Sequence, residues 1–109
     1  MSGVIGIPDK EPWLVAGWAF RLILERTTTQ LSDPADAREV EQAIALHGLH
    51  FKFLPQGQGL RLARALFKVA ADLRPELLAS ADSRDQSLAG YLVTLQSQLD
   101  DAYDLSGSG

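Results

Sequence analysis

The chain contains no cysteine. It can therefore form neither a disulfide nor a zinc–thiolate site, and it has no cysteine nucleophile. This composition is typical of reducing compartments, so we expect a cytoplasmic protein. The first twelve residues, MSGVIGIPDKEP, also lack the long apolar run and the small-residue cleavage site of a secretory signal.

No apolar segment has the length of a membrane span. The most hydrophobic stretch runs from Trp13 to Leu24 and includes Arg21, whereas a span needs about 20 apolar residues. The net charge of −4 opposes attraction to nucleic-acid phosphates and to anionic lipids. We therefore expect neither a nucleic acid nor a membrane among the partners.

The composition is that of one folded domain. The chain has 109 residues, of which 46% are hydrophobic and 22% are charged, and this length suits a single hydrophobic core. We assign residues 1–105 to one helical domain and the last four residues, SGSG, to a flexible tail at 106–109.

Hydrophobic periodicity predicts an all-α fold, a four-helix antiparallel bundle-like domain. Leu49, Phe51 and Phe53 alternate with polar residues, which indicates a short extended segment near residues 49–54. A two-stranded pairing of residues 4–7 with 50–53 would give that segment a partner. The expected helices span residues 10–29, 34–47, 58–74 and 84–104.

Local signals set the ends of these helices. Ser32 or Asp33 precedes Pro34 and predicts an N-cap, and Gly48 predicts the following C-terminal stop. Pro75 is expected to interrupt the third helix. Ser83 with Gln86 three residues later resembles a capping box for the fourth.

The first and fourth predicted helices both contribute to the expected core. Helix 10–29 is apolar nearly all round, so we expect Trp18 and Leu22 to be buried at the centre of the bundle. In the fourth helix, leucines and an alanine recur at four- and three-residue spacing and predict a packing seam. Its members are Leu88, Leu92, Leu95, Leu99 and Ala102.

Two glycines, Gly57 and Gly59, precede a helix that carries Arg61 and Arg64. A Walker loop would need lysine and then serine or threonine after its last glycine, and Leu60 stands there instead. The favoured interpretation is a turn followed by a solvated polar face. A small anion bound by the glycines and arginines is the alternative.

The two histidines, His47 and His50, are three residues apart, but Gly48 separates them and no acidic ligand lies close in the sequence. We expect no metal site and no cofactor. The sequence also carries no nucleophile elbow and no histidine beside a patterned serine or aspartate. We therefore predict a protein that is not an enzyme, without catalytic residues.

Acidic residues gather at the end of the fourth helix. From Asp85 onward the chain has no lysine or arginine. Asp100, Asp101 and Asp104 lie where the helix dipole disfavours negative charge. Solubility of a frayed helix end is one explanation. The other is a partner-binding surface for a basic protein, with Tyr103 as an aromatic anchor.

The leading hypothesis is a non-enzymatic protein-binding module. In its narrower form this is an inhibitor of the bacterial immunity protein or antitoxin type, whose acidic helix masks a basic effector. The first alternative is an assembly module that forms a homodimer through the apolar helix at 10–29. The second is a small anion-binding regulator that uses the Gly57–Gly59 loop.

Overall fold

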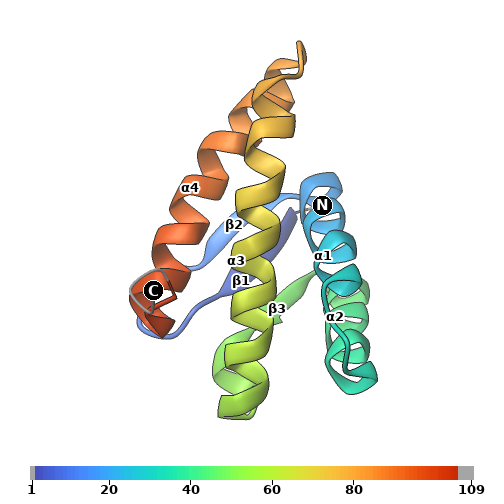
Figure 1. Cartoon of the computed structure of the whole chain (residues 1–109), viewed down its shortest axis with the longest axis vertical. Coiled ribbons are helices and arrows are strands. Elements are labelled where there is room, and N and C mark those ends of the chain that lie inside the picture. Colours follow the sequence, from blue (N-terminus) through green and yellow to red (C-terminus); the bar gives the residue numbers. More distant parts are fainter. Residues whose placement is uncertain (1, 106–109) are drawn as a thin grey trace.

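The computed structural model describes residues 2–105 and shows a mostly helical chain with a small three-stranded sheet (Figure 1). The predicted tail at 106–109 lies outside the described residues. The elements in chain order are β1 (Ser2–Gly6), β2 (Trp13–Ala16), α1 (Gly17–Thr29), α2 (Pro34–Leu46), β3 (Gly48–His50), a 3₁₀ turn (Phe51–Phe53), α3 (Gln56–Leu78) and α4 (Ser83–Tyr103).

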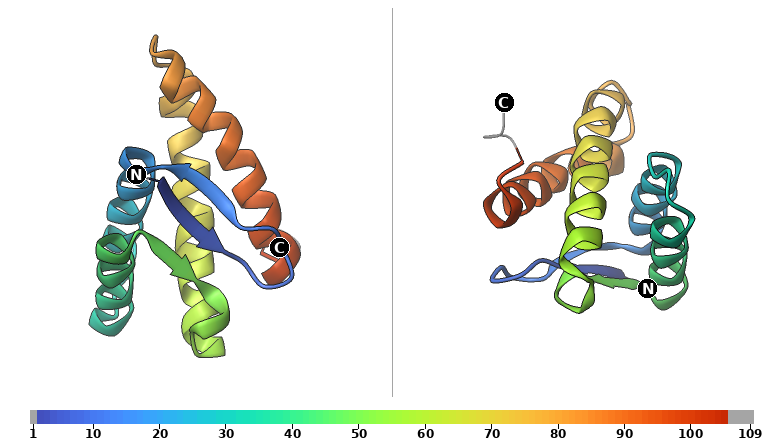
Figure 2. Two further views of the ribbon diagram at one scale, coloured as in Figure 1. Left: turned by 180° about the vertical axis from the view of Figure 1, so that it is seen from behind. Right: turned by 60° about the horizontal axis from the view of Figure 1, so that its bottom comes forward.

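The sheet has the order β2-β1-β3, with β1 in the centre. β2 pairs with β1 antiparallel and places Val15 opposite Gly3, whereas β3 pairs with β1 parallel and places Leu49 opposite Ile5. The helices lie on one side of this sheet (Figure 2). Side chains on that side, such as Ile5 and Leu49, are buried. Leu14 points the other way and is 63% exposed.

The helical character and a strand near residues 49–54 are confirmed, but a four-helix bundle is not. The predicted pairing of residues 4–7 with 50–53 is confirmed in outline, with β3 two residues earlier than expected. Phe51–Phe53 then forms a 3₁₀ turn instead of continuing the strand.

The predicted helix at 10–29 was wrong in its first half. Lys10 donates its backbone N–H to the carbonyl of Ile7, and Asp9 has a φ of 63°. Pro8 followed by a residue with positive φ is the pattern of a type II turn. Asp9, Glu11 and Pro12, residue types that are typical of a helix start, therefore belong to the connection between β1 and β2.

Burial alternates along β2 in the way expected of a half-buried strand. Trp13 and Val15 face the core, while Leu14 and Ala16 are exposed. Trp18, predicted to be buried, is 40% exposed because α1 begins only at Gly17 and turns the indole outward. Leu22 is half-buried against the core.

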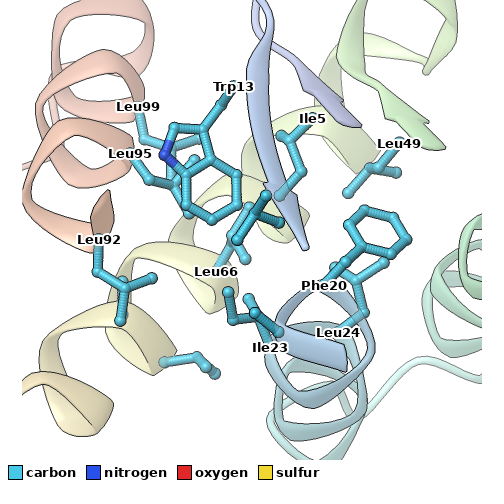
Figure 3. Close-up of a cluster of buried hydrophobic side chains, with 14 of the residues drawn as sticks. Ile5, Trp13, Phe20, Ile23, Leu24, Leu49, Leu66, Leu92, Leu95 and Leu99 are labelled. Atoms are coloured by element: carbon cyan, nitrogen blue, oxygen red, sulfur yellow. The ribbon is translucent and has the colours of Figure 1, made fainter. Parts of the chain in front are cut away.

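The core fills the space between the sheet and the helices (Figure 3). Phe20 and Ile23 of α1 meet Leu66 of α3 there. The Trp13 side chain of β2 lies beside Leu95 and Leu99 of α4. Its indole Nε1 also donates to the Tyr91 carbonyl at 2.9 Å, which ties the edge strand to α4.

Pro75 does not interrupt α3, contrary to prediction. Leu73 and Leu77 are both buried on either side of it. A proline inside a helix costs about 3 kcal/mol. Burial of two leucines contributes roughly 1.5–3 kcal/mol each and offsets that cost.

The helix caps follow the predictions only in part. Asp33 caps α2 by accepting a hydrogen bond from the Ala35 N–H, as expected. α2 ends at Leu46, one residue earlier than predicted, and His47 instead of Gly48 takes the left-handed conformation at the C-cap. The predicted capping box at Ser83 is wrong, because Asp82 caps α4 and accepts from the Arg84 N–H.

Gly90 provides a test of helix propensity in α4. A β-carbon built there meets no atom within 4 Å, so no other part of the described chain packs closely on this position. We expect Gly90→Ala to raise the free energy of unfolding by about 1 kcal/mol, because glycine disfavours a helix interior by that amount. Urea unfolding measures the change. A loss of stability would show that another surface packs on this position.

Candidate functional site

The acidic residues at the end of α4 have structural contacts of their own. Asp101 pairs with Lys10 of the β1–β2 connection at 3.2 Å, and both side chains remain partly exposed. Asp104 is the C-cap of α4 with a φ of 53°. Aspartate tolerates this left-handed conformation better than most residues. Asp104 is exposed, and Asp100 is half-buried.

Tyr103 points toward the core, and Ala102 is exposed, which reverses their predicted orientations. The Tyr103 ring lies 5.8 Å from the ring of Phe51. Burial raises the pKa of its hydroxyl. The aromatic group expected to anchor a partner therefore helps to hold the end of α4 on the fold.

Exposed aromatic side chains gather instead where β2 leads into α1. Trp18 and Tyr91 line a hollow of about 350 Å³ between these elements and α4, which we call the α1–α4 groove. The Arg84 guanidinium lies 5.1 Å from the centre of the Trp18 ring, a cation–π distance. The Nη2 atom of Arg84 also lies 3.4 Å from Oδ2 of Asp82. Tyr91, on the next turns of α4, is 56% exposed.

One side of α4 connects this groove with the acidic end of the helix. Tyr91, Thr94, Gln98 and Asp101 have i, i+3, i+7 and i+10 spacing and so share one stripe. Gln98 donates to the Glu11 carbonyl at 3.3 Å, which places the stripe beside the β1–β2 connection. We call the stripe together with Trp18 and Asp104 the α4 face; Asp100 lies on the opposite side of the helix from Tyr91.

The two glycines at the start of α3 do not form an open cradle. The Gly59 N–H already donates to the Pro55 carbonyl at 2.8 Å. A β-carbon at Gly59 would lie 3.3 Å from the Tyr103 hydroxyl, so this glycine allows α4 to approach. Gly57 is exposed. Both lie inside the first turns of α3, which begins at Gln56.

Arg61 is held by a buried carboxylate that the sequence did not reveal. Its Nε and Nη2 donate to the two oxygens of Asp36 at 2.7 and 2.9 Å. Gln58 adds a third hydrogen bond at 3.2 Å. The Asp36 side chain is 2% exposed and that of Arg61 is 52% exposed. The hydrogen bonds from Arg61 lower the pKa of Asp36, although its burial acts in the opposite direction.

A second hollow of about 290 Å³ lies beside this ion pair, between the α1–α2 connection and α3. We call it the basic cleft. Arg61, Arg64 and Lys68 line one wall, as their i, i+3, i+7 spacing on α3 requires. Ser32 and Asp33 belong to the opposite wall. Arg61 and Arg64 are thus together, but beside α2 and not around the two glycines.

The remaining polar groups to consider are the two histidines and the acidic side chains. Neither His47 nor His50 has a hydrogen bond to a serine or carboxylate within residues 2–105. In the same part of the chain, no three histidine or acidic residues are grouped to hold a metal ion. A search of that part for a helix with the length and apolarity of a bilayer span also found none.

Two features of these sites escaped sequence reasoning. Asp36 stands in the first turn of a helix, where an acid is expected for the helix dipole, so its pairing with a residue 25 positions later has no local signal. Trp18 was assigned to the core because β2 was interpreted as helix.

Comparisons with family models, curated proteins and solved structures found no match to this chain.

Proposed function

We propose that this chain is a non-enzymatic protein-binding module and that the α4 face binds a basic protein. The observation that carries the proposal is that exposed aromatic side chains at the α1–α4 groove and acidic side chains at the end of α4 lie along one helix surface. Trp18 of α1 and Tyr91 of α4 lie at the groove, and Asp101 and Asp104 lie about three to four turns after Tyr91 along α4.

The charge of this face specifies the chemistry of the partner. From Asp85 to Tyr103 α4 carries no lysine or arginine, and Lys10 is the cation paired with Asp101. Complementary potentials speed encounter and select partners. A lysine- or arginine-rich protein surface is the occupant that fits, in keeping with an inhibitor of the immunity protein or antitoxin type.

The aromatic groups supply the contact energy in this proposal. Tryptophan, tyrosine and arginine dominate the binding energy of protein interfaces. Here Arg84 stacks on Trp18 next to Tyr91, so all three types meet at one groove. In this proposal the acidic side chains speed association with the partner, and the contacts in the groove slow its dissociation.

The homodimer alternative has less support than the sequence suggested. It rested on a helix that was apolar on every side. Trp13 and Val15 are now accounted for by the buried side of β2. Light scattering on the isolated protein tests this alternative, and a mass of twice 11.8 kDa would favour self-association over the proposed function.

The proposal is tested by first identifying the proteins captured from an extract of the source organism and then measuring binding with the purified partner. We expect Tyr91→Ser to raise the dissociation constant at least tenfold, since a hot-spot residue contributes about 1.4 kcal/mol or more to the binding free energy. Phe53→Ser is the matched control, because Phe53 is 75% exposed and lies outside the α4 face.

A second variant, with Asp100, Asp101 and Asp104 all changed to asparagine, tests the steering role. Asparagine keeps the tolerance for left-handed backbone that Asp104 requires. We expect slower association and a weaker dependence of the association rate on salt. Unchanged rates at low and high salt, together with wild-type affinity in Tyr91→Ser, would overturn the proposal.

A further inference from the structure

The basic cleft is independent of the α4 face and has an unusual charge for this protein. Arg61, Arg64 and Lys68 converge on it in a chain whose net charge is −4. Elsewhere in residues 2–105, four basic side chains each pair with one carboxylate, as Arg21 does with Glu25, whereas the lining of the cleft has three cations and two carboxylates. The lining of the cleft therefore has one more positive than negative charge.

The arginine at the head of the cleft is fixed in place. Asp36 accepts two hydrogen bonds from Arg61, and Gln58 binds the same carboxylate. Two parallel hydrogen bonds to a carboxylate restrict both the position and the plane of a guanidinium. Because Asp36 is buried, this arrangement is held from inside the fold, and about half of the Arg61 side chain remains exposed.

The other two cations are available. Arg64 has no carboxylate partner within residues 2–105. Lys68 lies 3.8 Å from Asp72 in a pair whose two side chains are both 61% exposed. A solvated pair of this kind contributes little stability. Lys68 can therefore turn toward a ligand with little loss of folding free energy.

We propose that the basic cleft binds the phosphate group of a small molecule. Arg64 donates to two phosphate oxygens in the planar geometry that arginine offers, Lys68 supplies a second charge, and Ser32, which also lines the cleft, adds a hydroxyl group. Asp33 is the opposing charge. Its Oδ1 already accepts from the Ala35 N–H, and with Asp36 neutralised by Arg61 the cleft keeps a net positive charge.

The volume of about 290 Å³ suits a small phosphate compound, because ligand pockets of this class begin near 300 Å³. The glycines at the start of α3 have no part in this site. It also differs from the α4 face in both its residues and its location, so either proposal can fail without the other.

Titration with inorganic phosphate at constant ionic strength, followed by amide NMR, tests the site. We expect saturable shifts confined to residues 30–36 and 61–68. Arg64→Gln and Lys68→Gln should each weaken binding about tenfold, because each removes a charge-assisted hydrogen bond. Lys52→Gln, which removes an exposed lysine outside the cleft, should bind as the wild type does.

The same spectra show whether each variant is folded, so a loss of binding is distinguished from a loss of structure. Phenyl phosphate in a parallel titration separates the two sources of the group: tighter binding than phosphate supports an organic monoester, and weaker binding supports free phosphate. Shifts that do not saturate, that spread over all basic residues, or that persist unchanged in both cleft variants would overturn the proposal.

Discussion

Replacing Phe20 with alanine is expected to lower the free energy of unfolding by about 3–5 kcal/mol, the range for deleting a buried aromatic ring. Phe20 is 1% exposed and lies in the core beside Leu24 and Leu49 (Figure 3). The stability of a domain this size is about 5–15 kcal/mol, so the variant loses a large part of it. Urea unfolding monitored by circular dichroism measures the change.

Trp18→Ala is the matched control, because it removes a larger ring from the same helix at a position that is 40% exposed. Surface substitutions usually change stability by less than about 0.5 kcal/mol, and the lost contact with Arg84 adds about 0.5–1 kcal/mol. Equal losses in the two variants would contradict the assignment of Phe20 to the core and Trp18 to the surface.

Gly3→Ala gives a second check that the Phe20 ring packs in the core. A β-carbon at Gly3 would overlap the Phe20 ring, so Gly3→Ala should destabilise the protein by about 1–3 kcal/mol through overpacking. In the double variant the smaller side chain at position 20 leaves room for the new methyl group. Its loss should therefore be smaller than the sum of the two single losses, as for residues in direct contact.

The sequence predicted the long amphipathic helices because their signals are local. The leucines at positions 88, 92, 95 and 99 are all buried in α4, and Asp33 caps α2 as expected. These features depend on hydrophobic period and on side chains that bind their own helix. No distant part of the chain is needed to interpret them.

The error at the N-terminus had a non-local cause. Trp13–Ala16 can continue the apolar pattern of α1. The helix starts at Gly17, and its N-cap residue, Ala16, has no side-chain cap hydrogen bond, so no polar residue marks its true beginning. What makes this segment a strand is its pairing with β1. The turn at Pro8 and Asp9 was the available signal, but Asp9 followed by Glu11 and Pro12 is also typical of a helix start.

The candidate sites were predictable to different degrees. The acidic end of α4 was visible as a charge pattern, although the contacts of Tyr103 with Phe51 and of Asp101 with Lys10 were not. The basic stripe on α3 was also visible. Its proximity to the α1–α2 connection depends on tertiary packing, and so does the burial of Asp36.

Asp36→Asn is expected to destabilise the protein by about 2 kcal/mol at pH 7, because hydrogen bonds to a charged group contribute about 1.5–3 kcal/mol. Arg61 donates twice to this carboxylate, whose side chain is 2% exposed. Arg61 itself stays half exposed in the variant and is rehydrated. The expected loss is therefore smaller than that for an ion pair buried on both sides.

The loss should also depend on pH with a definite sign. The pKa of Asp36 is lowered from 3.8 in the folded protein. Its stabilising effect is therefore complete above the unfolded pKa and is lost as the pH falls through the lower, folded pKa. The difference between wild type and variant should be constant from about pH 7 to pH 5 and should decrease below about pH 4.

Unfolding by urea across this range measures the difference directly, because carboxylates common to both proteins cancel in the comparison. Asp101→Asn is the control, since its pair with Lys10 is partly exposed and an exposed pair contributes at most about 1 kcal/mol. A difference for Asp36→Asn that stays the same down to about pH 2 would show that shape, and not the charge held by Arg61, stabilises this part of the fold.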